Sequence, residues 1–308
     1  MTGDAAAARR RHGATLSVGA AVAFGTGPVM IKAALDTGIA VPTLMALRLL
    51  MAAAVLWILV LAGRALARLR PGEARYVAPA LAVGALIYAA QLACFALALE
   101  RISASLVVIL FQTFPIVVSV VAVLTGRDRM TRRTVTALTL GVGGVALVAL
   151  AGDEVRAEPV GILLGLGSAV ACAGVVLSSD VLSDRLPPTA LSALLISGAS
   201  IAFAATLFVA GVDTAITTST WLLILAIALV PGVLGTTAML AGVRAIGPSL
   251  ASILMTLEPL VAVMLAWIVF GERLNGGQLV GAAGILLAAY FARGVARPLE
   301  ADIEVVRS

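Results

Sequence analysis

The chain has 308 residues, of which 61% are hydrophobic and 12% are charged, whereas an average soluble domain has roughly 45–50% and 25%. Twenty-one basic and 16 acidic side chains give a formal charge of +5. A mean hydropathy of +1.12 excludes a soluble fold and leaves no polar surface with which this basic chain could bind nucleic acid. The positive charge is therefore interpreted against a membrane.

Cofactor and catalytic motifs are missing from the sequence. The single histidine, His12, lies in the N-terminal tail, and Cys94 and Cys172 lie in apolar stretches without CxxC spacing. Neither a disulfide framework nor a zinc site is indicated, and no GxxxxGK[ST], HExxH or GxSxG motif is present. We expect a protein without enzymatic activity, metal or cofactor. The alternative is an integral-membrane enzyme or scaffold with an unrecognised site.

Apolar stretches predict an all-α integral membrane protein with ten transmembrane helices, since about 20 residues of helix cross roughly 30 Å of hydrocarbon. The predicted spans are 13–31, 49–63, 76–99, 102–126, 134–152, 159–179, 186–212, 214–243, 245–271 and 274–292. Only the ninth contains a charge, Glu258. The first span is not interpreted as a cleavable signal peptide, because nine further spans follow it without a cleavage context.

The distribution of arginine predicts the orientation in the membrane. With a cytoplasmic N-terminus, sixteen arginines fall in internal segments and three, Arg101, Arg156 and Arg273, fall outside. This is a strong positive-inside bias. The loop at 153–158, which contains three acids, then falls outside. Both termini are therefore expected on the cytoplasmic side.

An internal repeat divides the chain into two halves. A shift of 144 positions places 102–129 over 246–273, and nine of the 28 positions are identical, including Pro115 with Pro259 and Arg129 with Arg273. We therefore expect two five-helix repeats, 1–152 and 153–308. An odd number of helices in each repeat makes the second copy inverted, which is the symmetry of alternating-access transporters.

Each half has a proline within its fourth predicted helix, after Phe114 in the first half and after Glu258 in the second. Proline removes a backbone donor and clashes with the preceding turn, so carbonyl groups are freed near the middle of the membrane. Corresponding breaks in two repeats indicate a substrate site at Pro115 and Pro259. The alternative is that these prolines only shape helix packing.

Glu258 is the deepest of four ionisable residues in or beside the predicted helices. Thirteen charge-free residues flank it on either side, so its carboxyl group cannot reach either membrane surface and must be paired or protonated. It either faces a cavity and binds a proton or a cationic substrate group, or it forms a hydrogen bond to the other half. Asp180 is expected at a hydrated helix end.

The remaining candidate site residues are less decisive. Lys32 and Arg48 are predicted near the outer ends of the first two helices. One interpretation is that both side chains reach the lipid headgroups. The other is that they form a cationic rim, which attracts a carboxylate or closes an outer gate with Asp36. Four uncharged polar side chains are candidates to line a cavity. They are Tyr88, Gln91, Gln112 and Thr113.

The second half carries a longer motif, Ser-Leu-Ala-Ser-Ile-Leu-Met-Thr-Leu-Glu-Pro at 249–259, followed by Phe-Gly-Glu-Arg-Leu at 270–274 and Gln-Leu-Val-Gly at 278–281. With 103–115 in the first half and Arg48 in Ala-Leu-Arg-Leu-Leu, it resembles the EamA family of the drug/metabolite transporter superfamily. The resemblance covers about 15–292. The first half departs from it at 126–129, which reads Gly-Arg-Asp-Arg instead of Phe-Gly-Glu-Arg.

The resemblance implies a secondary transporter of small metabolites, often amino acids or related compounds, that works by alternating access in the inner membrane of a bacterium. Export is favoured over uptake, and protons are the candidate coupling ion. The cavity would be lined by the first, third, fourth, sixth, eighth and ninth helices. Expected partners are the small-molecule substrate and the lipid bilayer, for a monomer or a homodimer.

Overall fold

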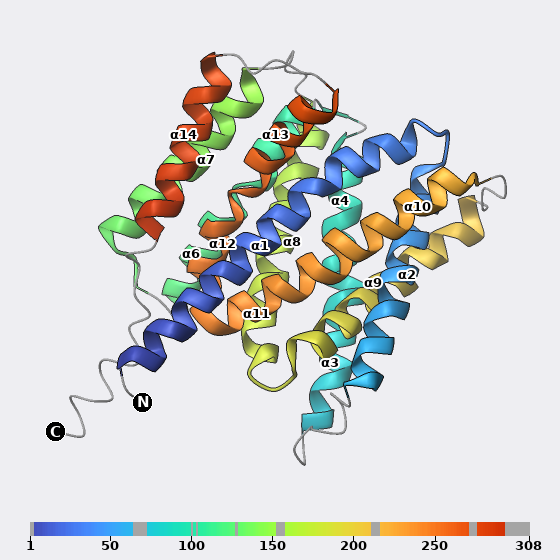
Figure 1. Cartoon of the computed structure of the whole chain (residues 1–308), viewed down its shortest axis with the longest axis horizontal. Coiled ribbons are helices and arrows are strands. Elements are labelled where there is room, and N and C mark those ends of the chain that lie inside the picture. Colours follow the sequence, from blue (N-terminus) through green and yellow to red (C-terminus); the bar gives the residue numbers. More distant parts are fainter. Residues whose placement is uncertain are drawn as a thin grey trace.

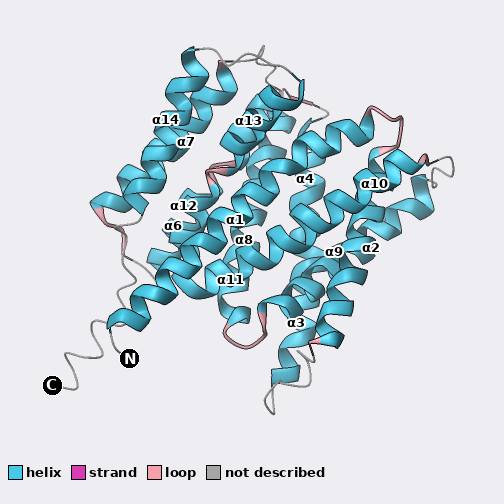
Figure 2. Cartoon of the chain, in the orientation of Figure 1, coloured by secondary structure: helices cyan, strands magenta, loops and turns pink. Residues whose placement is uncertain are grey.

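The computed structural model describes residues 3–63, 73–99, 101–102, 104–126, 129–151, 158–210, 216–270 and 276–292. Every regular element in these ranges is a helix (Figure 2). Helices satisfy their own backbone hydrogen bonds, which lipid cannot do for them. The predicted all-α class is confirmed.

The elements of the first half follow the predicted spans. We call the helical elements that correspond to one predicted span a rod, and the third and fourth rods are each divided into several elements. They are α1 (Gly3–Leu35), α2 (Val41–Ala62), η2 (Glu73–Tyr76), α3 (Val77–Ala82), η3 (Val83–Tyr88), α4 (Ala89–Leu99), α5 (Ala104–Phe111), α6 (Phe114–Leu124) and α7 (Arg132–Leu150). The η2 turn is a 3₁₀-helix, and η3 is a π-helix that continues directly into α4.

The second half repeats this order of elements. They are α8 (Pro159–Ser183), α9 (Pro188–Ala210), α10 (Thr218–Ile227), η4 (Ala228–Gly235), α11 (Thr236–Ile246), α12 (Pro248–Met255), α13 (Glu258–Phe270) and α14 (Gly276–Ala292). Again the third rod contains a π-helix, η4, and the fourth rod is divided into two helices. Both irregularities therefore occur at corresponding places in the two halves.

Seven helices among the described residues are long and apolar enough to cross a membrane. They are Ala7–Leu35, Val41–Ala62, Glu73–Ala98, Val107–Leu124, Pro159–Ser183, Pro188–Leu207 and Thr218–Ile246. Shorter apolar helices cover Pro248–Ala262 and Leu279–Ala288. A multi-pass membrane protein is supported, and the number of ten crossings stays a prediction.

Packing between the halves is reciprocal. The most extensive contact joins α7 to α14, which occupy the same place in the two halves, and α2 packs on its counterpart α9 (Figure 1). Helix α1 packs on α11, and its counterpart α8 packs on α4. Likewise α1 lies against α13 while α8 lies against α6. Exchanged contacts of this kind are what a pseudo-two-fold axis between the halves would give.

Glycines allow the π-helices to touch the neighbouring rods closely. A Cβ atom added at Gly84 in η3 would overlap the backbone of Leu195, and one at Gly198 would lie 2.5 Å from the amide nitrogen of Ala85. Small residues let helix backbones approach in this way in membranes. Helix α9 is thereby fixed against η3.

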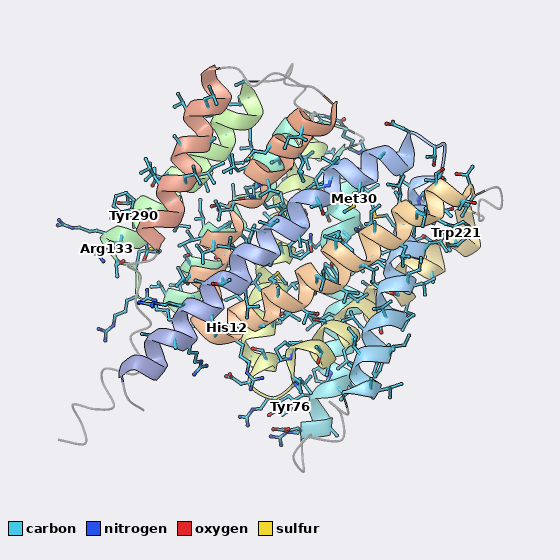
Figure 3. All side chains as sticks on the ribbon, in the orientation of Figure 1. His12, Met30, Tyr76, Arg133, Trp221 and Tyr290 are labelled. Carbon is cyan, nitrogen blue, oxygen red and sulfur yellow. The ribbon has the colours of Figure 1, made fainter. Side chains whose placement is uncertain are left out.

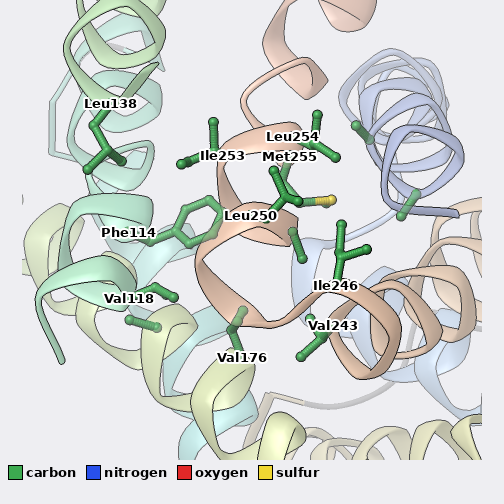
Figure 4. Close-up of a cluster of buried hydrophobic side chains, with 14 of the residues drawn as sticks. Phe114, Val118, Leu138, Val176, Val243, Ile246, Leu250, Ile253, Leu254 and Met255 are labelled. Carbon is green, nitrogen blue, oxygen red and sulfur yellow. The ribbon is translucent and has the colours of Figure 1, made fainter. Parts of the chain in front are cut away.

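The main core lies where the two divided rods cross. Phe114 and Val118 of α6 pack against Leu250 and Ile253 of α12, together with apolar side chains of α1, α8 and α11 (Figure 4). Leu138 of α7 closes this core on one side. The crossing is thus surrounded by helices of both halves.

Polar contacts between distant segments occur at each of the two ends of the molecule. At one end, Nη2 of Arg9 donates a hydrogen bond of 3.3 Å to the carbonyl oxygen of Arg244. At the other end, Arg101 and Glu158 form an ion pair of 3.0 Å. The predicted boundary at residue 152 and most of the acidic loop at 153–158 lie outside the described residues.

His12, Tyr76 and Arg133 lie toward the end of the molecule that carries the N-terminus, whereas Trp221 lies toward the opposite end (Figure 3). This arrangement brings segments of the first and third rods and the start of α7 to one end, as the predicted topology requires. Which end faces the cytoplasm stays a prediction.

Candidate site at the crossing of the divided helices

Both divided rods leave the α-helix over two residues, directly before a proline-containing helix. In the first half the hydroxyl of Thr113 donates a 2.6 Å hydrogen bond to the carbonyl oxygen of Leu110. In the second half the hydroxyl of Thr256 donates a 2.7 Å hydrogen bond to the carbonyl oxygen of Ile253. These side chains satisfy carbonyl groups at the end of the preceding helix. The expected breaks in the helices are present.

Pro115 and Pro259 follow the first residue of α6 and α13. Proline is tolerated in the first turn of a helix, where its missing N–H has no intrahelical partner in any case. Both prolines are buried, and α6 packs against α12. The two breaks therefore lie in the protein interior.

Glu258 is the first residue of α13, and the residue is half-buried. Free N–H groups in the first turn of a helix favour a carboxylate there. Among the described residues, Glu258 forms no ion pair. Its electrostatic interaction is with Cys172, a free thiol of α8. The carboxyl group is thus placed beside the crossing without a counter-ion.

Helix α1 lies directly over this second break. A Cβ atom on Gly25 would lie 2.8 Å from the carbonyl oxygen of Glu258 and 2.6 Å from Cβ of Val261. Only glycine leaves room for this approach. The backbone of α1 is therefore packed directly against the backbone of Glu258 at the start of α13.

Arg48 turns inward from α2. Its Nε atom is buried without a hydrogen-bond partner, and its electrostatic partner is Tyr88, the last residue of η3. Burial of Nε places this atom within the protein, and the choice between a headgroup anchor and an outer rim with Asp36 stays a prediction. Tyr88 also interacts with Thr236, the first residue of α11, whose hydroxyl donates a 3.5 Å hydrogen bond to the carbonyl oxygen of Pro231.

Cys172 connects the two charged groups. It interacts electrostatically with Tyr88 on one side and with Glu258 on the other. All of these side chains except Thr236 are partly accessible, although helices of both halves surround them. Electrostatic interactions thus link three of the predicted site residues, Arg48, Tyr88 and Glu258, through Cys172.

For the other predicted polar residues, no contact with these side chains is seen among the described residues. Gln112 is 1% exposed, and both atoms of its side-chain amide lack a hydrogen-bond partner. Gln91 is buried in α4, and its carbonyl oxygen accepts a 3.1 Å hydrogen bond from the hydroxyl of Ser168. Thr113 bonds its own helix. The side chain of Lys32 lies outside the described residues.

Sequence reasoning missed Cys172 and Thr236 and misplaced Asp180. The first two are neutral side chains in apolar segments, where residue type alone gives no signal for a site. Asp180 is 9% exposed, and it is not at a hydrated helix end, because Leu182 and Leu186 next to it pack against α9 and α11. Across the described residues, no group of three or more metal-binding side chains occurs.

Comparison with solved structures shows the fold. The crystal structure of another protein matches this fold with a TM-score of 0.79 and 18% sequence identity. The match covers 94% of this chain and 98% of the other. No functionally curated protein matches the sequence. A family model described as the EamA-like transporter family matches residues 11–150 and again 159–294. Because these two matches include nearly all of the helical chain, the protein belongs to the EamA-like transporter family.

Proposed function

We propose that this protein is a secondary transporter that exports small metabolites, most readily amino acids or related compounds, across the inner membrane of a bacterium. The observation that carries this proposal is the position of Glu258. Glu258 is half-buried at the second helix break, against α1 of the other repeat, and no ion pair neutralises its carboxyl group within the described residues. A charge in this position is costly unless it binds something.

The two repeats supply the mechanism. We take residues 1–152 and 153–308 as inverted five-helix halves that rock against each other, with ten crossings and both termini in the cytoplasm. The reciprocal contacts of α1 with α11 and of α8 with α4 support this symmetry. A site on the axis between two such halves can open to each side of the membrane in turn.

Glu258 acts as the partner of a proton or of a substrate amine. Its place in the first turn of α13 stabilises the carboxylate, whereas its enclosure by α1 and α8 disfavours an uncompensated charge. A proton or an ammonium group relieves this conflict. The charge state of Glu258 would then couple substrate binding to the change between the two open states.

Flux measurements test the transport function. The purified full chain is reconstituted into liposomes, and uptake of a panel of radiolabelled amino acids is measured at several pH values. We expect at least one to cross with the wild-type protein and none to cross with Glu258→Gln. Glu158→Gln is the matched control, because this exposed acid pairs with Arg101 far from the crossing, and it should transport like the wild type.

Two outcomes would overturn the proposal. An unchanged rate with an unchanged pH dependence in Glu258→Gln would end the role of this carboxyl group. A wild-type protein that moves no member of the panel would end the assignment of amino acids, and a new lipid product in the same vesicles would favour a membrane enzyme instead.

Labelling of the loop at 153–158 tests the topology. A cysteine placed in this loop should react with a membrane-impermeant maleimide added outside intact cells, with the wild-type protein as the background. Labelling only after access from the cytoplasm would invert the proposed orientation.

A further inference from the structure

Two arginines, one from each repeat, share a single aromatic ring at the end of the molecule that carries the N-terminus. The guanidinium carbon of Arg75 lies 5.0 Å from the ring centre of Tyr76, and that of Arg185 lies 5.7 Å from the same centre (Figure 3). Both distances are those of cation–π contacts. Nη2 of Arg75 also donates a 3.0 Å hydrogen bond to the hydroxyl oxygen of Tyr76. We call these three residues the tyrosine–arginine cluster.

The fold determines where this cluster forms. Tyr76 is the last residue of η2, and its side chain packs on a buried group that includes Leu182 and Leu186 of the second half. Arg185 lies between these two leucines, in the turn after α8, where its backbone N–H donates a 3.0 Å hydrogen bond to the carbonyl oxygen of Leu182. The same apolar contact therefore fixes the ring and brings the second guanidinium to it.

The positive charges of the cluster are not neutralised within the protein. Among the described residues, neither Arg75 nor Arg185 forms an ion pair, although Asp184 is adjacent in sequence. Two like charges on one ring repel each other, and water screens only part of this repulsion at an exposed position. An anion bound by both guanidinium groups would remove it. Guanidinium groups present a fork of donors that matches the oxygens of a phosphate.

Apolar surface adjoins the cluster. Val181 lies four residues before Arg185 and is 44% exposed. Ala78 and Pro79, which follow Tyr76, are exposed as well. Tyrosine is enriched at the level of the lipid headgroups, and basic sites between transmembrane helices bind acidic headgroups. A ligand that carries both a phosphate and acyl chains can use both surfaces, whereas inorganic phosphate can use only the charged one.

We propose that Arg75, Tyr76 and Arg185 bind the phosphodiester of one anionic phospholipid, with its acyl chains along the apolar surface beside Val181. This lipid site is separate from the crossing of the divided helices and does not depend on the proposed transport function. Phosphatidylcholine carries the same phosphodiester beside a quaternary ammonium group, which the two guanidinium groups repel. Because one arginine comes from each repeat, a bound headgroup joins the two repeats at this end of the molecule.

Native mass spectrometry of the detergent-purified full chain tests the site without any transport step. Dioleoylphosphatidylglycerol or dioleoylphosphatidylcholine is added at rising concentration, and the concentration that half-saturates binding of one lipid is measured for each. We expect the wild type to bind phosphatidylglycerol more tightly. Arg75→Gln and Arg185→Gln should each weaken this binding by about tenfold, as for the loss of a hydrogen bond between charged groups, and should not weaken binding of phosphatidylcholine.

Matched variants separate this site from a general attraction to positive charge. Arg132→Gln removes an exposed arginine at the start of α7 and should bind phosphatidylglycerol like the wild type. Arg185→Lys should retain part of the binding, since it keeps the charge and loses the fork. Tyr76→Phe keeps the ring and should retain most of it. Because Arg75 and Arg185 are exposed, the lipid-free variants should have the thermal midpoint of the wild type.

Three results would overturn the lipid site. Equal weakening in Arg75→Gln, Arg185→Gln and Arg132→Gln would mean that a basic surface attracts anionic lipid without a defined site. Equal binding of the two lipids by the wild type would mean that apolar contact alone holds them. Inorganic phosphate that displaces phosphatidylglycerol at the same concentration as the lipid would identify a site for free phosphate instead.

Discussion

The two helix breaks have the same backbone design and opposite chemistry. At the position before proline, the first half has Phe114 and the second half, 144 residues later, has Glu258. Phe114 is 3% exposed and belongs to the main core, whereas Glu258 is partly accessible and faces Cys172. The residue before proline thus packs in the core at the first break, whereas at the second break it is a carboxyl group that is available to bind a ligand.

Aromatic contacts make the first break rigid. The ring of Phe114 lies 5.5 Å from that of Phe111 on the other side of the break, and Phe111 packs edge-on against Phe95 of α4 at 5.4 Å. Aromatic pairs of this geometry contribute beyond the area that they bury. No such pair exists at the second break among the described residues, where Gly25 of α1 touches the backbone. We infer that the first break serves as the support against which the second one works.

The largest expected effect is a separation of transport from stability between the two positions. Glu258→Leu should lower the flux of any transported amino acid by 100-fold or more, on the order of the loss of a charged hydrogen bond or ion pair. Phe114→Leu should keep most of the flux. Proteoliposome assays of both variants measure this. The assignment of roles would be reversed by a Phe114→Leu protein that is folded and inactive beside an active Glu258→Leu protein.

Stability should respond in the opposite way. Phe114→Ala leaves a cavity in the core cluster and should lower the free energy of unfolding by about 3 kcal/mol. This value is at the low end of the usual range, because helices in a bilayer associate by packing more than by burial from water. Glu258→Leu should leave the thermal midpoint unchanged or raise it. Thermal unfolding in detergent compares them, and equal losses in both variants would contradict the comparison.

Glycine substitutions probe the helix that covers each break. Gly25→Ala would place a methyl group against the Glu258 carbonyl oxygen and should cost about 1–3 kcal/mol, together with reduced flux. Gly19→Ala is the control on the same helix, because nothing lies within 4 Å of its added Cβ. Gly165→Ala on α8 meets only the flexible side chain of Leu110, at 2.9 Å, and should cost less. A thermal midpoint for Gly25→Ala equal to that of Gly19→Ala would show that α1 does not constrain the second break.

Much of the fold could be predicted because proline and charge are conspicuous in an apolar chain. Pro115, Pro259 and the repeat identified the breaks, and Glu258 was recognisable as a charge that no surface could solvate. The direction of Arg48 could not be predicted, since a residue near a helix end can point to either side. Cys172 carries no sequence signal, and its proximity to Tyr88 and Glu258 is visible only once the chain is folded, with α8 against η3.

The π-helices also could not be predicted from the sequence. The segment Val83–Tyr88 has the composition of any apolar helix, and its wider turn depends on packing against α9 through Gly84 and Gly198. Such contacts join residues more than one hundred positions apart, so local propensity has no information on them. The same holds for Thr236, which becomes a site residue only because η4 ends directly before it.

The smallest expected effects have opposite signs at equivalent positions. Gln112 and Thr256 are 144 residues apart, and both are 1% exposed, but only Thr256 has its hydrogen bond, to the carbonyl oxygen of Ile253. Gln112→Met removes an unsatisfied amide at nearly constant shape and should stabilise the protein by about 1 kcal/mol. Thr256→Val removes a satisfied hydroxyl and should destabilise it by about the same amount.

The thermal midpoints of these two variants are measured in detergent, and their transport rates are measured in proteoliposomes. The two measurements together show whether the first break moves during transport. If Gln112→Met is stable but transports slowly, the amide finds its partners only after the two repeats have moved, and the first break takes part in the cycle. If Gln112→Met is both stable and fully active, the first break is a support alone. A destabilised Gln112→Met protein would contradict the observed lack of partners, because it would mean that the buried amide makes a favourable interaction.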